Sequence, residues 1–319
     1  MNFRTKISLS KQSHGQISYD SNLLLLGSCF AENIGCKLEY FKFQSSVNPF
    51  GILFHPIAIE KLILKAINEE NFTEEDIFYL NERWHCFNAH SSLSANSKEE
   101  LLESLNKALN TLNQQLNNST HIIITLGSAW VYRYIETNSI VTNCHKVPQK
   151  KFIKELLSVE DIVESLDSIV SLVKNVNADA SIVFTVSPVR HLKDGFVENN
   201  RSKSHLLSAV HQVVEPRRVL YYFPSYEIMM DELRDYRFYE EDMIHPNALA
   251  IDYIWERFKE VCISEQSFST MDDVETIQKG LSHKPFNPES EQHQKFLANL
   301  EKKRENIQNQ FPFISFEVA

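Results

Sequence analysis

Apolar runs and amphipathic repeats alternate along this chain of 319 residues. Residues 23–26, 121–126, 181–187 and 219–223 are apolar at most positions, which is typical of short strands buried on both faces. Between these runs, leucine, isoleucine and valine recur every three or four residues, which indicates helices with one apolar face. The alternation predicts an α/β protein with a three-layer α/β/α architecture, in which helices cover both faces of a doubly wound parallel sheet.

Capping and turn residues indicate where the helices begin and where loops interrupt the pattern. Residues 44–51 contain Asn-Pro and a glycine, so a loop is expected there. Alternating stretches at 130–135 and 140–143 predict a hairpin inserted after the second main strand. Helices are expected directly after Ser28, at Pro56, after Ser97, after Ser158, near Ser202 and through Ile251.

The character of the sequence changes near residue 267. Residues 1–266 hold all the apolar strand runs, and we assign them to one α/β domain with an irregular lead-in over residues 1–20. Residues 267–319 are charged, have a helical pattern and end in an apolar tail. We expect them to form a helical C-terminal appendage that folds back on the core or binds a partner.

Charge and cysteine content narrow the class of protein. The formal net charge is -10 and no basic patch stands out, which argues against nucleic acid or an anionic membrane as a partner. The first residues lack the apolar segment of a signal peptide, and no apolar run is long enough to cross a bilayer. Five cysteines without paired spacing are typical of reduced thiols, so a cytoplasmic protein is expected.

Polar residues follow three of the predicted strands. Gly27-Ser28, Gly127-Ser128 and residues 187–191 each stand at the carboxyl end of an apolar run. In a parallel sheet these ends lie at one edge, and the ligand crevice is outside that edge. We therefore expect these residues to face one another.

Ser28 and the motif Asp242-x-x-His245 together indicate nucleophilic catalysis. An imidazole can take the proton of a serine hydroxyl, and a carboxylate on the other ring nitrogen fixes the tautomer. Gly27 permits a sharp turn before Ser28, and the start of a helix stabilises developing negative charge. The alternative is that Ser28 only caps the helix, as serines commonly do.

The order of these motifs resembles the SGNH or GDSL-type esterases and lipases, in which a serine follows the first strand and Asp-x-x-His precedes the last helix. Residues 27–31 spell GSCFA, the name of the GSCFA family within that superfamily. Four further segments look like the family's remaining signatures. They are NPFG at 48–51, NCHK at 143–146, SPVRH at 187–191 and DxxHP at 242–246. The resemblance spans residues 20–262.

The resemblance implies a catalytic role for three residues. Ser28 would be the nucleophile, His245 the general base and then the general acid, and Asp242 the residue that orients the imidazole.

The resemblance also implies an oxyanion hole. The backbone N–H groups of Ser28 and Gly51 would donate to the oxyanion. A third donor of the superfamily, an asparagine side chain after the second main strand, is replaced here by Ala129. We expect Asn143 to take its place, with Ser128 as the second candidate.

Substrate contacts are expected from Asn48, Ser128, His145, Arg190 and His191. Some of these residues also have plain structural interpretations. His191 could support the fold or Asp242, and Arg190 could pair with an acidic loop instead of binding a carboxylate or phosphate on the substrate. Lys203, beside Ser202, is expected to neutralise nearby acid at the start of a helix.

A metal site is the alternative for Cys144 and His145. Zinc ligands usually come in pairs at short spacing, and neither this segment nor residues 85–90 has that pattern. We therefore expect no metal and no cofactor.

These residues predict a serine esterase or acyl hydrolase that forms an acyl-enzyme. Its substrate would be a small-molecule or carbohydrate acyl ester, and deacetylation of an O-acylated sugar or glycoconjugate is one form, by analogy with the superfamily. Because Ala129 breaks the oxyanion pattern, the alternative is a weak or inactive module that binds a sugar or acylated ligand. A homo-oligomer could assemble through the C-terminal appendage.

Overall fold

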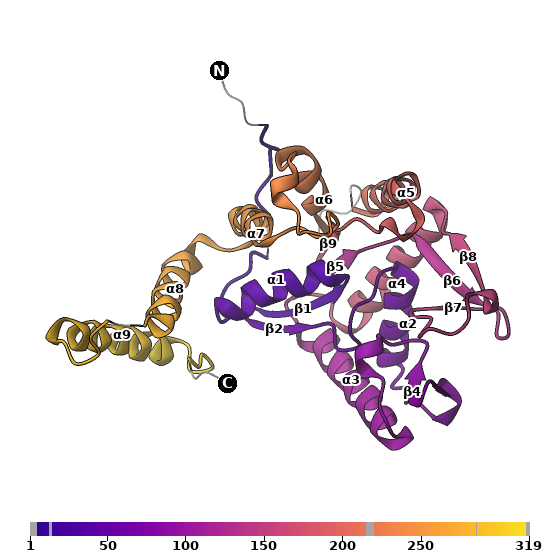
Figure 1. Cartoon of the computed structure of the whole chain (residues 1–319), viewed down its shortest axis with the longest axis horizontal. Helices are drawn as coiled ribbons and strands as arrows, with labels where there is room; N and C mark the ends of the chain where they lie inside the picture. Colours follow the sequence, from indigo (N-terminus) through magenta and orange to yellow (C-terminus); the bar gives the residue numbers. More distant parts are fainter. Residues whose placement is uncertain (1–4, 13–14, 215–219, 285, 317–319) are drawn as a thin grey trace.

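A computed structural model describes residues 5–12, 15–214, 220–284 and 286–316. Its centre is a five-stranded sheet in which every pair of neighbouring strands is parallel (Figure 1). The strand order is β10-β9-β5-β1-β2. These strands are β1 (Asn22–Gly27), β2 (Gln44–Val47), β5 (His121–Leu126), β9 (Ser181–Val186) and β10 (Leu220–Phe223).

The apolar runs of the sequence form the strands of this sheet, and both faces of these strands are buried. Leu24 and Leu26 pack in one apolar cluster, and Leu23 and Leu25 pack in another. The first cluster contains residues of α2 (Pro56–Ile67), α3 (Lys98–Asn118), α4 (Val159–Val176) and α5 (Phe196–Val214). The second contains residues of α1 (Cys29–Tyr40), α7 (Ala248–Cys262) and α8 (Phe268–Ser282). The predicted α/β fold, with helices on both faces of a parallel sheet, is confirmed.

The strand order creates a switch point between β1 and β5. From β1 the chain runs outward to β2, and it then crosses back over β1 to β5. In open α/β sheets a ligand binds beyond the carboxyl ends of the strands at such a point. Gly27 lies opposite Thr125 in the register, so the ends of β1 and β5 are side by side there.

Two predicted boundaries were wrong. Residues 44–47, expected in a loop, form the edge strand β2, which is only partly buried and so lacks an apolar run. Helix α5 begins at Phe196, before the expected start near Ser202, because its first turns face solvent and carry no apolar repeat. By contrast, the predicted starts at Pro56 and after Ser158 are confirmed, the latter with a complete capping box.

The insertion after β5 is larger than the predicted hairpin. Strands β6 (Trp130–Tyr134) and β7 (Ser139–Val141) form that hairpin, and β8 (Phe152–Leu156) pairs with the other side of β6. A separate two-stranded sheet consists of β3 (Ile77–Leu80) and β4 (Arg83–Cys86). The remaining helical segments are short: α6 (Ser225–Glu227), the π-helical Ile228–Glu232, and 3-10 turns at Glu74–Asp76, Ser91–Leu93, Gln149–Lys151, Leu192–Asp194, Tyr236–Phe238 and Glu265–Ser267.

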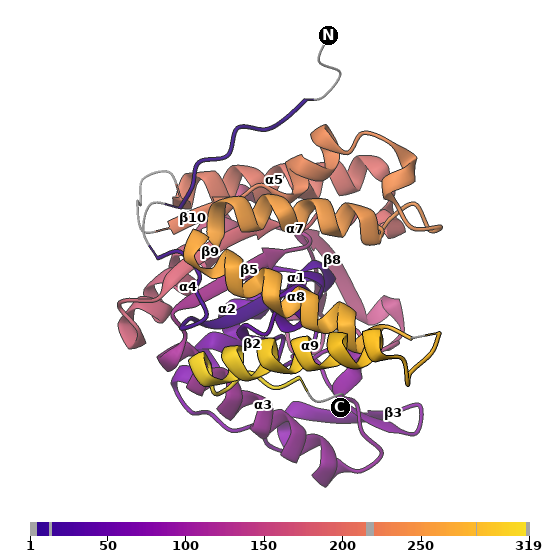
Figure 2. The same cartoon turned by 90° about the vertical axis from the view of Figure 1, so that its left-hand side faces the viewer.

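The C-terminal helices pack on the α1 side of the core. Helices α8 and α9 (Glu291–Gln310) lie side by side (Figure 2), and Gly280 of α8 faces the Leu300 side chain of α9. The apolar tail also contacts the core, because the ring centres of Phe311 and Tyr19 lie 4.9 Å apart and Ile314 belongs to the α1-side cluster. Across the described ranges, no helix is both long enough and apolar enough to cross a lipid bilayer.

Candidate active site

Ser28 stands at the carboxyl end of β1 and is the N-cap of α1. Its Oγ accepts a hydrogen bond from the backbone N–H of Phe30 at 3.4 Å, and its own N–H donates to the carbonyl of Thr125 at 3.0 Å. The residue is fully buried, with 0% of its surface exposed. Ser28 is therefore a helix cap, as the alternative interpretation of the sequence predicts. Its hydroxyl is not exposed to solvent in this structure.

Asp242 and His245 form a closely bonded pair in the loop before α7. Asp242 Oδ2 lies 2.6 Å from His245 Nδ1, and Oδ1 accepts from the backbone N–H groups of Ile244 and His245 at 2.8 and 3.0 Å. These bonds to His245 and Ile244 stabilise the carboxylate and lower the pKa of Asp242 to about 2. The imidazole is thus held through Nδ1, which leaves Nε2 as its available nitrogen.

The segment after β9 joins this loop to the sheet edge. The N–H of Arg190 donates to the carbonyl of Ile244 at 3.3 Å. The imidazole of His191 interacts electrostatically with Lys203 and His245, and burial followed by these two repulsions lowers the pKa of His191 to about 3. The 187–191 segment therefore contacts the His245 loop.

Lys203 of α5 ties two strand ends together. Its Nζ donates to the carbonyl of Gly127 at 2.8 Å and to that of Ser187 at 2.7 Å. Within the described ranges, no carboxylate pairs with this ammonium group. The expectation that Lys203 neutralises nearby acid at a helix start was wrong, because the residue lies inside α5 and is only 1% exposed.

The ring of Phe54 packs between the Ser28 side and the His191 side of the site. A Cβ on Gly127 would lie 3.1 Å from Phe54 Cδ1 and 3.2 Å from Ser28 Cβ, so both side chains touch this glycine. The same phenyl ring meets the His191 ring edge-on, with the ring centres 5.1 Å apart. Among the described residues, no hydrogen bond joins Ser28 to His245. Phe54 is therefore a candidate barrier over Ser28.

Asn48, the first residue after β2, has an unused donor beside Ser28. Its Oδ1 accepts from the backbone N–H of Gly27 at 2.8 Å, and the side chain is largely buried, with 7% exposed. Its Nδ2 is buried and has no hydrogen-bond partner. A buried amide without a partner is costly, so this N–H group is a candidate binding group.

The two expected backbone donors are already occupied. The N–H of Gly51 donates to the carbonyl of Asn48 at 2.7 Å, just as that of Ser28 donates to Thr125. Gly51 has φ of 73°, and a Cβ there would lie 2.5 Å from His90 Cβ. A glycine is therefore needed for the turn and for the close approach of His90.

Asn143 and His145 contact the 86–89 loop instead of Ser28. His145 Nε2 lies 2.7 Å from the carbonyl of Cys86 and 3.1 Å from that of Ala89, and Asn143 Oδ1 accepts from the N–H of His145. Burial lowers the pKa of His145 to about 4, so the ring is neutral near pH 7. The expected oxyanion role of Asn143 and substrate role of His145 find no support in these contacts, which hold a loop in place.

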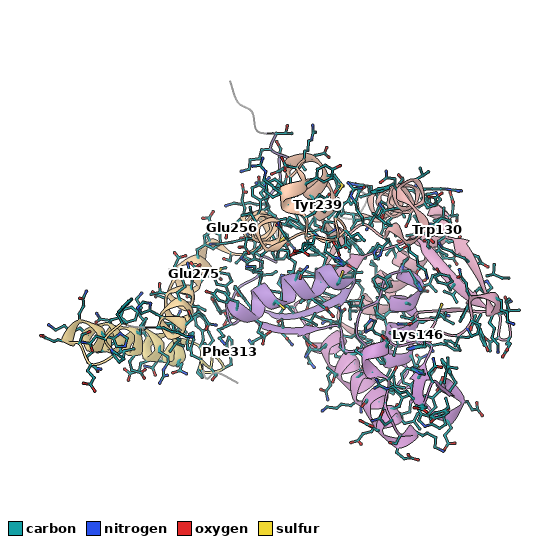
Figure 3. The ribbon with its side chains drawn as sticks, in the orientation of Figure 1. Trp130, Lys146, Tyr239, Glu256, Glu275 and Phe313 are labelled. Carbon is teal, nitrogen blue, oxygen red and sulfur yellow. The ribbon has the colours of Figure 1, made fainter. Side chains whose placement is uncertain are left out.

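Ser128 is likewise used in packing. Its Oγ accepts from the N–H of Trp130 at 3.0 Å and lies 3.3 Å from Ser202 Oγ. Ser202 Oγ in turn accepts from the N–H of Ala129 at 2.7 Å. The two serines fasten the end of β5 to α5, and Trp130 continues into the three-stranded insertion (Figure 3). Ser202 lies inside α5 and so does not cap the start of that helix, while the substrate contact expected of Ser128 stays a prediction.

Comparison with known proteins gives one result at the level of family. The family model described as GSCFA family matches residues 22–258, and the model described as GSCFA domain protein, C-terminal domain, matches residues 274–318. No curated protein matches the chain. The chain belongs to the GSCFA family.

Proposed function

We propose that this member of the GSCFA family is an acyl-ester hydrolase of the SGNH type, with Ser28 as nucleophile and His245 as base. The observation that carries the proposal is the 2.6 Å contact between Asp242 Oδ2 and His245 Nδ1 in a loop bonded to the segment beside the β1–β5 switch point. A carboxylate on Nδ1 directs the Nε2 lone pair outward, as a general base requires.

The reaction would proceed in two steps. Ser28 Oγ attacks the acyl carbon while its proton passes to His245 Nε2, and the carbonyl electron pair moves to the oxygen. Collapse of this tetrahedral intermediate expels the alcohol, which takes the proton from Nε2 and leaves the acyl group on Ser28. Water then repeats the sequence through the same imidazole and releases the acid.

The oxyanion would be bound by the amide of Asn48. Its Nδ2 is unpartnered, and Oδ1 anchors the amide to the N–H of Gly27, the residue before Ser28. This donor would take the place of the superfamily's asparagine side chain, which this chain lacks because it has Ala129 there, and it comes from the loop after β2 instead. A fixed donor at an oxyanion is worth about 10²- to 10³-fold in rate.

Access to Ser28 would depend on Phe54. Because Ser28 is fully buried and the Phe54 ring packs against Gly127 and His191, a substrate reaches the hydroxyl only after that ring moves. Aromatic side chains change rotamer far faster than most enzymes turn over. The proposal therefore includes Phe54 as a gate that opens on substrate binding.

A fluorophosphonate probe tests the proposal, since it reacts with activated serines. We expect labelling of the native full chain at Ser28, mapped by peptide mass spectrometry, and none in Ser28→Ala. Ser158→Ala is the matched control, because Ser158 also caps a helix through its Oγ, at 3.1 Å from the N–H of Asp161. Labelling that persists in Ser28→Ala, or no labelling of folded wild-type protein, would contradict the proposal.

A second candidate function is a module that binds an acylated ligand without turnover. The burial of Ser28 and the occupied N–H groups of Ser28 and Gly51 favour it. This function predicts that ligand affinity persists in Ser28→Ala and that the wild-type chain is not labelled by the probe.

A further inference from the structure

Two basic side chains at the sheet edge lack a negative partner. Across the described residues, neither Arg190 nor Lys203 forms an ion pair with a carboxylate, although the chain has 42 acidic and 32 basic residues. Elsewhere in the fold such pairs are common, as between Arg133 and Glu155. In a chain of net charge -10, an uncompensated positive cluster needs a physical reason.

Lys203 is the deeper of the two. Its side chain is buried, and its ammonium group donates to the carbonyls of Gly127 and Ser187 and lies 5.7 Å from the centre of the Tyr226 ring. Burial, with repulsion from Arg190, lowers the pKa of Lys203 to about 7. Carbonyl dipoles and an aromatic ring compensate a buried cation only in part, so a nearby anion would favour the charged form of Lys203.

Arg190 lies nearer to the surface and is only partly buried. Its Nη2 is 2.9 Å from Met230 Sδ, and its Nε is 3.4 Å from the hydroxyl of Tyr239, whose place is labelled in Figure 3. A thioether and a phenol are neutral acceptors, and they leave most of the five N–H groups of the guanidinium unused. The planar fork of an arginine fits the oxygens of a carboxylate, sulfate or phosphate.

The acidic side chains near this cluster have other partners. Asp242 binds His245, Asp194 pairs with Lys154, and Glu227 accepts from the hydroxyl of Tyr222. His191, which interacts electrostatically with Lys203, adds a buried Nε2 that has no hydrogen-bond partner. Asp194 acts on His191 electrostatically, but among the described residues no carboxylate forms an ion pair with Arg190 or Lys203.

We infer that the ligand of this site carries an anionic group, a carboxylate, sulfate or phosphate, which Arg190 contacts while Lys203 supports it electrostatically. The ester part of the ligand rests on the proposed function. Anion binding does not, because it needs neither Ser28 nor His245. The substrate class is thus an acylated acidic molecule. The sequence-based alternative, in which Arg190 pairs with an acidic loop of its own chain, has no support among the described residues.

Anion binding can be measured without turnover. Full-length Ser28→Ala protein is titrated with sulfate, inorganic phosphate and acetate at constant ionic strength, with chloride as the balancing ion. The readouts are the Nε–H resonance of Arg190 and the thermal unfolding midpoint. We expect saturable binding of at least one anion. The added change Arg190→Gln should weaken it at least about tenfold, the loss of a charge-assisted bond, and Arg190→Lys should retain part of it.

Arg234→Gln is the matched control, because Arg234 is exposed and already paired with Asp231. It should bind the anions like its parent. The anion that binds most tightly distinguishes a carboxylate from a sulfate or phosphate on the natural ligand. The inference is wrong if none of the three anions changes the Arg190 resonance or the unfolding midpoint more than chloride does. It is also wrong if Arg190→Gln and Arg234→Gln bind the anions equally well. Anion binding without probe labelling of Ser28 in wild-type protein would instead overturn the hydrolase proposal alone.

Discussion

The two halves of the candidate site differ sharply in their exposure. Ser28 is fully buried, its N–H donates to the carbonyl of Thr125 in β5, and its hydroxyl accepts from the N–H of Phe30 in α1. The side chains of Asp242 and His245 are 45% and 47% exposed, and bonds within their own loop hold them in place. The proposed base is therefore oriented and accessible, whereas the proposed nucleophile is covered. This contrast indicates that access to Ser28 limits the site more than orientation of the imidazole does.

Removing the charge from the exposed half should have the largest effect. Asp242→Asn keeps the shape of the loop but favours the wrong imidazole tautomer, so we expect kcat/KM for p-nitrophenyl acetate to fall by about 10³- to 10⁴-fold. Asp235→Asn is the control, since Asp235 is another exposed aspartate bonded within its own turn. Equal activity of the two variants would remove Asp242 from the mechanism.

The same carboxylate sets a limit on acid sensitivity. The folded-state pKa of Asp242, about 2, is below its ordinary value of 3.8. Its contribution to stability is therefore complete above pH 3.8 and is lost as the pH falls through about 2. Loss of activity between pH 5 and 7 must accordingly come from another group than Asp242.

In the buried half of the site, a single substitution can remove the proposed oxyanion donor. Asn48→Asp keeps the acceptor for the N–H of Gly27 and tolerates the φ of 44° at this position, but it removes the Nδ2 donor. We expect kcat to fall by about 10²- to 10³-fold with little change in KM. Asn143→Asp should change kcat little. The reverse ranking of the two variants would return the oxyanion role to Asn143.

Removing the Phe54 ring should make Ser28 more accessible and so reduce the difference in exposure between the two halves of the site. Phe54→Ala removes the ring between Gly127 and His191, so we expect the rate of fluorophosphonate labelling at Ser28 to rise by about tenfold. The free energy of unfolding should fall by about 1–3 kcal/mol, as for truncation of a partly buried aromatic side chain. Phe78→Ala, in β3, is the control for general loosening of the fold. A labelling rate that rises equally in both variants would argue against a gate.

The last prediction concerns the pH dependence of the free energy of unfolding, which the burial of Lys203 should change without a direct effect on the reaction. Because the folded-state pKa of Lys203, about 7, is below its ordinary value of 10.5, the unfolded chain binds more protons between these values. The free energy of unfolding should therefore rise as the pH increases from 7 to 10. Lys203→Met, which has no titrating group, should lack this part of the rise in urea titrations. If the free energies of unfolding of the two proteins rise in parallel with pH, burial does not lower the pKa of Lys203.

Much of the fold could be predicted from local pattern. The leucines of β1 alternate between two helical layers, and such a run can be interpreted without knowing its neighbours. β2 could not be predicted, because its residues, QSSV, become a strand only by pairing with β1 at the edge of the sheet. Likewise, α5 begins in exposed residues that carry no apolar repeat.

In the candidate site, too, the features set by local sequence could be predicted, whereas those set by contacts between distant segments could not. The Asp242–His245 pair was predictable because three residues of one loop determine its geometry. The free amide of Asn48 was not, because it depends on how the β2 loop meets Gly27. The NCHK motif suggested oxyanion and substrate contacts, yet His145 binds carbonyls of the 86–89 loop, a contact between distant segments that no spacing reveals.

A trapped acyl-enzyme would test the central claim most directly. Native full-length protein is mixed with p-nitrophenyl acetate, quenched in acid within the first turnover and digested, and the acetyl group is located by mass spectrometry. The account predicts acetylation of the hydroxyl of Ser28, at a rate that falls at least about a hundredfold in His245→Ala. An acetyl group found only on the neighbouring Cys29 or Lys203, or an unchanged rate in His245→Ala, would contradict it.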